Sequence, residues 1–260
     1  MSSTQLDAKG RIGYVLFDMD GLMINSEDVY TEVTNKILGR YGHEMSWEIK
    51  SGCMGRPERP ATEHLLSCFP GIPISIDEYI VERRALQDLS WPHVKPMPGI
   101  LRLVHHLIKH KIPIAVATGS QRRNYDLKTA HLQESLFGLF GKNVVCGDDA
   151  ELIGKGKPMP DVFLVAAKKL GMDVGEGDVE KEGLDEKLKE ERTKGLVFED
   201  AISGVQAGKR AGMKVIWIPD PRLKAQFAHE GDFGADEVLT TLEEFRPEEW
   251  GLPPYGDVTE

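Results

Sequence analysis

The sequence predicts an α/β fold, in which a mostly parallel β-sheet carries helices on both faces and a helical segment is inserted after the first strand. Short apolar runs alternate with amphipathic stretches along most of the chain, a pattern typical of crossover units with parallel strands. Residues 28–95 differ, because helical patterns follow one another there without a strong strand pattern. This stretch is too long for a loop within a compact domain, which indicates an inserted helical subdomain.

Five strands are expected, each a short run of branched and aromatic residues of the kind that is buried on both faces of a parallel sheet. The runs lie at residues 14–17, 112–117, 143–146, 196–198 and 215–218. Residues 100–110 carry an apolar stripe at helical spacing, which predicts a helix packed on the sheet. Further core helices are predicted at 162–170 and 201–211.

The insert divides the chain into a core domain of residues 1–27 and 96–260 and a helical cap of residues 28–95. Cap helices are predicted over residues 28–41, 60–68 and 75–88. Three prolines in residues 91–99 mark the return connection, and hinges are expected near 26–28 and 95–99. A charged stretch at 176–193, with eight acidic and four basic residues, predicts an exposed helix or loop on the core.

Composition narrows the classes of partner and compartment. A net charge of −10 disfavours non-specific binding to nucleic acid or an anionic membrane. No apolar run approaches the roughly 18 residues of a membrane span, and residues 1–11 lack the apolar centre of a signal peptide. Three cysteines without a C-x-x-C pair argue against a disulfide framework or a thiolate zinc site. We therefore expect a cytoplasmic monomer that binds neither nucleic acid nor membrane.

Polar motifs follow the predicted strands, and ligands of open α/β sheets bind at these carboxyl ends. Asp18-Met19-Asp20-Gly21 comes directly after the first strand. A turn at Gly21 can bring both carboxylates to one cleft, where one attacks and the other carries a proton. Taken alone, the motif also fits a surface turn.

Three further motifs follow later strands. Thr118-Gly119-Ser120 can form an anion cradle from a hydroxyl and backbone N–H groups, or simply cap a helix. Lys157 can neutralise phosphate oxygens, or be a solvated surface lysine. The adjacent acids Glu199 and Asp200 suit Mg²⁺, although acids also favour helix starts. Each motif alone is a modest signal, whereas the ordered set is specific.

This ordered set resembles the four motifs of the haloacid-dehalogenase-type hydrolases, and the insert resembles the helical cap of that family. The similarity covers nearly all of residues 12–252 and implies a Rossmann-like core and a phosphomonoesterase that forms a phospho-aspartate. It is carried by Asp18-x-Asp20-Gly21, Thr118, Lys157-Pro158-x-Pro160-Asp161 and Glu199-Asp200.

The resemblance assigns roles to single residues. Asp18 is implied as the nucleophile and Asp20 as the acid and base, while Thr118, Gly119 and Lys157 hold the transferred phosphoryl group. Dehalogenases of the superfamily lack the second aspartate, so Asp20 favours phosphoryl transfer.

The resemblance also implies Mg²⁺ as the cofactor. Asp18, the backbone carbonyl of Asp20, and Asp200 are implied as its ligands. Glu199 is implied either as a further ligand or as a support for the others.

The substrate is expected to be a small phosphorylated metabolite. Four segments are similar to eukaryotic pseudouridine-5′-phosphatases, and Arg56 of the cap is a candidate substrate contact, with a solvated arginine as the alternative. A sugar- or glycerol-phosphate phosphatase, a phosphomutase of the same fold and a catalytically silent binding protein remain open. The four segments are residues 18–22, 41–55, 147–149 and 245–255.

Overall fold

The structure is a computed structural model, and it describes residues 11–54, 56 and 58–256. Its centre is a parallel six-stranded sheet in the order β3-β2-β1-β4-β5-β6. The five predicted strands are present, and β6 is an additional short edge strand. The strands are β1 (Tyr14–Phe17), β2 (Ile114–Ala117), β3 (Val144–Val145), β4 (Gly195–Glu199), β5 (Lys214–Trp217) and β6 (Glu237–Val238).

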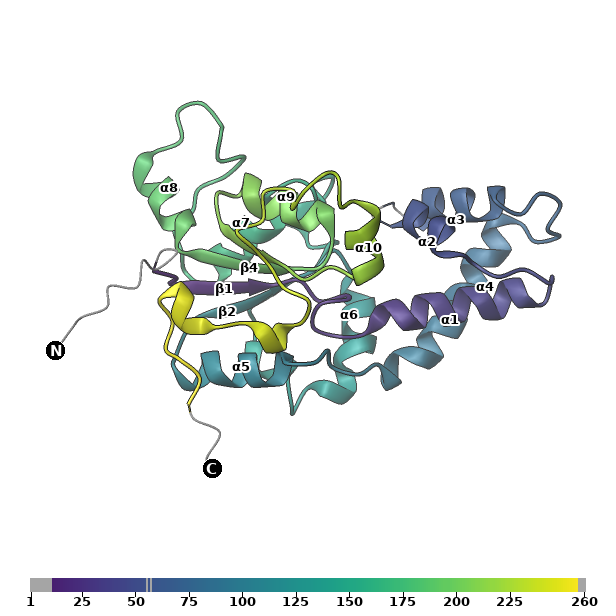
Figure 1. Ribbon diagram of the computed structural model, residues 1–260, viewed down its shortest axis with the longest axis horizontal. Helices are drawn as coiled ribbons and strands as arrows, with labels where there is room; N and C mark the ends of the chain where they lie inside the picture. The colour runs from purple at the N-terminus through teal and green to yellow at the C-terminus, as the bar shows by residue number, and fades with distance from the viewer. Residues whose placement is uncertain (1–10, 55, 57, 257–260) are drawn as a thin grey trace.

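Helices cover both faces of this sheet, as predicted (Figure 1). Successive residues of β1 enter opposite layers, because strand side chains alternate in direction. Val15 and Phe17 pack in the layer that holds α5, whereas Tyr14 and Leu16 pack in the layer that holds α7 and α9. The core helices are α5 (Ile100–Lys109), α6 (Arg122–Thr129), α7 (Asp161–Lys169), α8 (Glu186–Thr193), α9 (Ile202–Arg210) and α10 (Pro221–Gln226).

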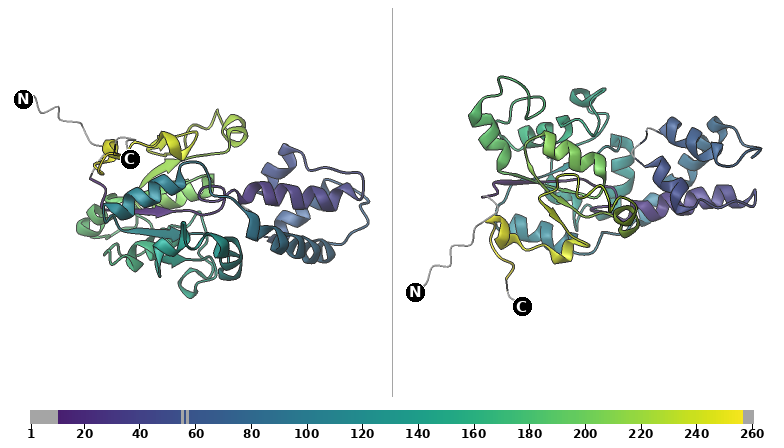
Figure 2. Two further views of the ribbon diagram at one scale, coloured as in Figure 1. Left: turned by 90° about the horizontal axis from the view of Figure 1, so that it is seen from below. Right: turned by 45° about the horizontal axis from the view of Figure 1, so that its top comes forward.

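The insert after β1 forms a helical body at one end of the molecule (Figures 1 and 2). It has its own apolar core, which includes Val33, Leu65 and Tyr79. The division of the chain at 27/28 and 95/96 stays a prediction. The insert contains α1 (Ser26–Gly39), α2 (Trp47–Cys53), α3 (Glu58–Ser67) and α4 (Ile76–Ser90).

Short 3-10 helices occur in several connections, and none of the helices that the structure describes is long and apolar enough to cross a membrane. The 3-10 helices are η1 (Trp91–His93), η2 (Ala130–Leu132), η3 (Phe137–Phe140), η4 (Ala150–Leu152), η5 (Leu242–Glu244) and η6 (Pro247–Trp250).

The two connections between core and insert run side by side. The backbone N–H of Asn25 donates to the carbonyl of Lys95 over 2.9 Å, and that of Met97 donates to the carbonyl of Met23 over 2.9 Å. Between these bonds, Ile24 and Pro96 form an antiparallel bridge. The two connections in which hinges are predicted therefore leave the core side by side, as one paired segment.

The charged stretch ends in α8, which projects from the core (Figure 1). Half of the residues of α8 are exposed, in agreement with the prediction of an exposed helix, and the others are partly buried apart from Arg192. Arg192 is the exception, since its side chain is fully buried and donates to the carbonyls of Val174 and Gly177. This arginine fixes the helix to the loop that follows α7.

Candidate active site

The parallel sheet places the predicted motifs at one edge. Phe17 of β1 is aligned with Val116 of β2 and with Phe198 of β4. The backbone N–H of Asp18 then donates to the carbonyl of Phe198 over 3.0 Å. The polar residues that follow these three central strands thus emerge together, at the end of the core that faces the insert (Figure 1).

Lys157 joins two of the predicted carboxylates. Its ammonium group donates to Asp18 Oδ1 over 2.5 Å and also donates to Glu199 Oε1. All three side chains are at most 12% exposed. The alternative interpretation of Lys157 as a solvated surface lysine is therefore wrong.

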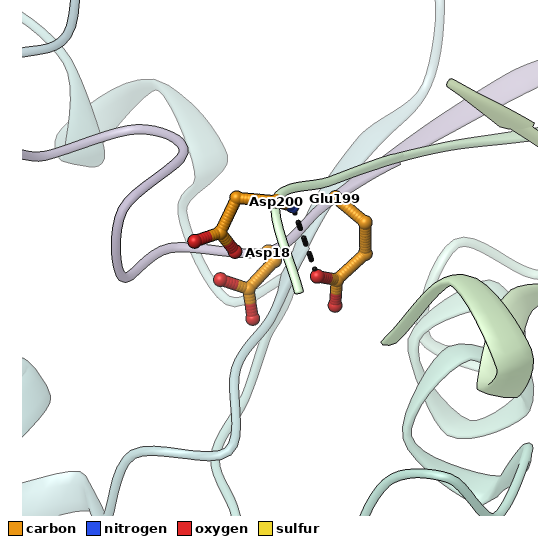
Figure 3. A group of neighbouring side chains, drawn as sticks. All are labelled: Asp18, Glu199 and Asp200. Atoms are coloured by element: carbon orange, nitrogen blue, oxygen red, sulfur yellow. Dashed lines mark hydrogen bonds between the residues drawn. The ribbon is translucent and has the colours of Figure 1, made fainter. Parts of the chain in front are cut away.

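Asp200 completes a group of three acids (Figure 3). One carboxylate oxygen from each of Asp18, Glu199 and Asp200 lies within 4.8 Å of the others. Glu199 has both oxygens engaged by protein donors, since its Oε2 accepts from the backbone N–H groups of Asp200 and Ala201, each at 3.1 Å. The Asp200 carboxylate accepts no hydrogen bond from the part of the chain that the structure describes.

The charges of this group favour a divalent cation. Burial raises the pKa of Asp18 to about 7, although the Lys157 ammonium opposes the shift. Burial and the neighbouring carboxylates also hold the pKa of Asp200 well above its usual range. One ammonium cannot balance three neighbouring carboxylates, of which those of Asp18 and Glu199 are buried, and oxygen donors of this kind are the ligands that Mg²⁺ prefers. The residues present therefore fit the predicted metal.

Gly21 allows Asp200 to approach the first motif. Its φ is +79°, and a Cβ at this position would lie 2.3 Å from Asp200 Oδ2. On the other side, the indole N–H of Trp217 donates to the backbone carbonyl of Asp200 over 2.8 Å. A glycine is required here both for the backbone angle and for the space.

Asp20 lies in a second polar cluster beside the first. Ser120 Oγ donates to its Oδ2 over 2.6 Å, and the ammonium of Lys128 donates to its Oδ1 over 2.6 Å. Burial acts to raise the pKa of Asp20, but the charge of Lys128 and the hydrogen bonds from Lys128 and Ser120 outweigh it and leave that pKa below its ordinary value.

Lys128 is a site residue that the sequence analysis missed. It belongs to α6, and its side chain is fully buried. Its spacing offered a signal, because Tyr125 and Leu132, three residues before it and four residues after it, are also buried. A lysine on the apolar side of a helix needs a buried partner.

The other predicted residues have different positions. Thr118 is fully buried, and its Oγ1 accepts from the backbone N–H of Ser120 over 3.0 Å. Gly119 is exposed between them. Arg56 is an exposed residue of the insert between α2 and α3, outside the acidic group.

A family model described as haloacid dehalogenase-like hydrolase matches residues 15–218, from β1 to the residue after β5. The chain belongs to this family. The resemblance predicted from the four motifs is thereby confirmed, as is the α/β fold.

Curated relatives of this hydrolase include two kinds of named phosphatase. (DL)-glycerol-3-phosphatase 2 of Arabidopsis thaliana is 44% identical over 96% of this chain and 95% of its own. Probable pseudouridine-5′-phosphatase of Drosophila melanogaster is 37% identical over 95% of this chain and 97% of its own. Among solved structures, a HAD family hydrolase from Deinococcus radiodurans with bound phosphate and sodium has a TM-score of 0.73 at 23% identity, covering 94% of this chain and 99% of its own.

Adding Mg²⁺ to the metal-free hydrolase is expected to raise its melting temperature. A ligand at 100 times its Kd stabilises a protein by about 2.7 kcal/mol, which corresponds to roughly 5–10 °C at this size. Differential scanning fluorimetry with Mg²⁺ and with EDTA measures the shift. Asp200→Asn should lose most of it, whereas Asp173→Asn, at an exposed position, should keep it. An equal shift in both variants would place the ion elsewhere.

Proposed function

We propose that this chain is a Mg²⁺-dependent phosphomonoesterase that hydrolyses a small phosphorylated metabolite through a phospho-aspartate on Asp18. The observation that carries the proposal is the buried pairing of Asp18 with Lys157 next to two further acids, with Asp20 held separately by Lys128 and Ser120. The pKa directions set by the protein groups alone oppose these roles, because the pKa of Asp18 is raised and that of Asp20 is lowered. The roles therefore rest on the geometry and on the order of the motifs. The phosphatase class agrees with the names of the relatives.

The protein groups divide the reaction between them. A carboxylate oxygen of Asp18 attacks phosphorus in line, and Asp20 protonates the departing alkoxide. Asp20 then takes a proton from the water that hydrolyses the phospho-aspartate. Lys157 offsets the negative charge that the substrate brings close to Asp18, while Thr118 and Gly119 hold the phosphoryl oxygens.

The metal would be held by Asp18, the backbone carbonyl of Asp20, and Asp200. When bound, Mg²⁺ neutralises phosphoryl oxygens and orients them for attack. We assign Glu199 a supporting role, because both of its oxygens already accept hydrogen bonds from Lys157 and from the backbone. It fixes the lysine rather than the ion.

For the substrate we favour a glycerol phosphate, on the basis of the relatives named (DL)-glycerol-3-phosphatase at 44% identity. Pseudouridine 5′-phosphate is the second candidate, favoured by relatives at 37% identity that are named probable pseudouridine-5′-phosphatases. Arg56 is proposed to contact the substrate from the cap. We further propose that the protein acts as a monomer in the cytoplasm and uses neither nucleic acid nor membrane as a partner.

A panel of phosphate esters tests this proposal. With Mg²⁺, the wild-type protein is expected to hydrolyse glycerol phosphate with a kcat/KM about tenfold or more above that for other esters. The panel includes pseudouridine 5′-phosphate, common nucleotides and hexose phosphates, with released phosphate as the readout. A preference for pseudouridine 5′-phosphate would assign the second candidate. Isomerised ester without free phosphate would indicate a mutase, and no turnover at all would contradict the enzyme.

A further inference from the structure

The ammonium group of Lys128 is fully buried and has a complete set of partners. It donates to Asp20 Oδ1 over 2.6 Å, to the Tyr30 hydroxyl over 3.0 Å and to Ser120 Oγ over 3.1 Å. These bonds use all three donors of a lysine. Because an incompletely paired buried charge is strongly unfavourable, this geometry holds each partner in a defined place.

The aromatic surroundings of the same ammonium come from the insert and its return connection. It lies 4.5 Å from the centre of the Trp91 ring and 5.2 Å from that of the Tyr30 ring. Tyr30 belongs to α1, just after the outward connection, and Trp91 begins η1, just before the return connection. The two rings also contact each other edge to face, with their centroids 5.3 Å apart.

Lys128 therefore lies where the loop after β1, the loop after β2 and the insert meet. Asp20 and Ser120 belong to the loops after β1 and β2, whereas Tyr30 and Trp91 belong to the insert side. An ion pair between Arg123 of α6 and Asp88 of α4, at 2.6 Å, adds to the contacts of α6 with the insert. The environment of Asp20 is thus built jointly by core and insert.

We propose that Lys128 is a positioning residue that orients the Asp20 carboxyl group for proton transfer to the leaving group and ties this orientation to the placement of the insert. The inference rests on the acid role proposed above for Asp20. Lys128 and Ser120 each bind one oxygen of Asp20, which fixes the rotation of the carboxyl plane. Each oxygen keeps a second acceptor position, and the side chain is 22% exposed.

The dependence of kcat/KM on the leaving group separates a positioning role of Lys128 from a merely structural one. An alkoxide such as that of glycerol phosphate must be protonated as it departs, whereas 4-nitrophenolate leaves without a proton. The value of kcat/KM covers only the steps up to this departure, so the later use of Asp20 with water does not affect it. Misplacing Asp20 should therefore slow the alkyl ester and spare the aryl ester.

The experiment compares kcat/KM for rac-glycerol 1-phosphate and 4-nitrophenyl phosphate in the full-length, Mg²⁺-loaded protein. Asp20→Asn is expected to lose about 10²–10⁴-fold on the glycerol ester. Lys128→Met, which keeps the length of the side chain, should lose about 10²-fold on that ester and less than about tenfold on the aryl ester. The matched control is Lys142→Met at an exposed position, which should leave both values unchanged.

Tyr30→Phe tests the link to the insert, because it removes one partner of Lys128 and keeps the ring. It should lower kcat/KM about three- to tenfold on the glycerol ester alone. If Lys128→Met loses activity equally on both esters, or loses none, the positioning role is wrong. The proposed function would still stand in that case, as long as Asp20→Asn loses activity on the glycerol ester. If Lys128→Met does not fold, the same comparison of the two esters is made with Tyr30→Phe. A loss on the glycerol ester alone would support the positioning role, and equal losses or none would overturn it. An Asp20→Asn variant without any preference between the esters would refute the acid role, and the inference with it.

Discussion

Asp18→Asn should lower phosphate release by more than about 10⁴-fold, because an amide oxygen cannot replace the carboxylate as the attacking atom. The substitution is nearly isosteric, and its amide oxygen can still accept from Lys157, which donates to Asp18 Oδ1 in the native site. The loss should therefore be chemical rather than structural. Steady-state release of phosphate from glycerol phosphate measures it, with circular dichroism to confirm the fold.

Acid quenching adds a direct test of the intermediate. Wild-type protein mixed with a ³²P-labelled ester and quenched in acid should retain label on the chain, and Asp18→Asn should not. Asp173→Asn, an exposed aspartate, is the matched control and should behave as the wild type. Turnover by Asp18→Asn within tenfold of the wild type would exclude this residue as the nucleophile.

Lys157→Met should affect both stability and rate. Its removal leaves Asp18 and Glu199 without their shared cation in a site where the lysine is 12% exposed. Breaking a buried pair in this way costs about 3–5 kcal/mol, or a melting temperature lower by roughly 6–20 °C. The rate should fall about 10²–10³-fold, the typical effect of removing one charge-stabilising donor.

Thermal denaturation in EDTA, together with kinetics in Mg²⁺, separates these two effects. Added Mg²⁺ should recover part of the lost stability in Lys157→Met, because the cation replaces some of the missing positive charge. Lys142→Met controls for the loss of a lysine. A metal-free variant as stable as the wild type would show that the carboxylates do not depend on Lys157.

The parts of the fold that apolar runs define could be predicted from the sequence. Strands such as Tyr14–Phe17 have no polar residue, and a polar motif marks the point where each central strand ends. In contrast, β6 consists of Glu237 and Val238, both only partly buried, and is held by pairing with β5. Nothing in two such residues distinguishes a strand from a turn.

The residues of the acidic group could be predicted from the sequence, but the ion pairs and hydrogen bonds around them could not. Asp18, Lys157 and Asp200 could be selected because motif order is visible in a sequence. For Lys128 the only signal was its spacing from Tyr125 and Leu132, because α6 has few apolar residues and the ion pair of Lys128 with Asp20 spans 108 positions of the chain. The position of Arg56 between the helices of the insert follows from its place in the sequence, whereas a contact with substrate does not.

The paired connections have a consequence for how this protein can change. Since Asn25 and Lys95 are joined by a backbone hydrogen bond, the insert enters and leaves the core at neighbouring points, much as a long hairpin loop does. Insertions with adjacent ends are readily tolerated, because the parent domain folds around them undisturbed. A differently shaped body could therefore take its place while the sheet and the acidic group stay as they are, provided that it again supplies partners for Lys128 such as Tyr30 and Trp91. Selectivity can therefore change in this chain through insert residues that lie away from Lys128.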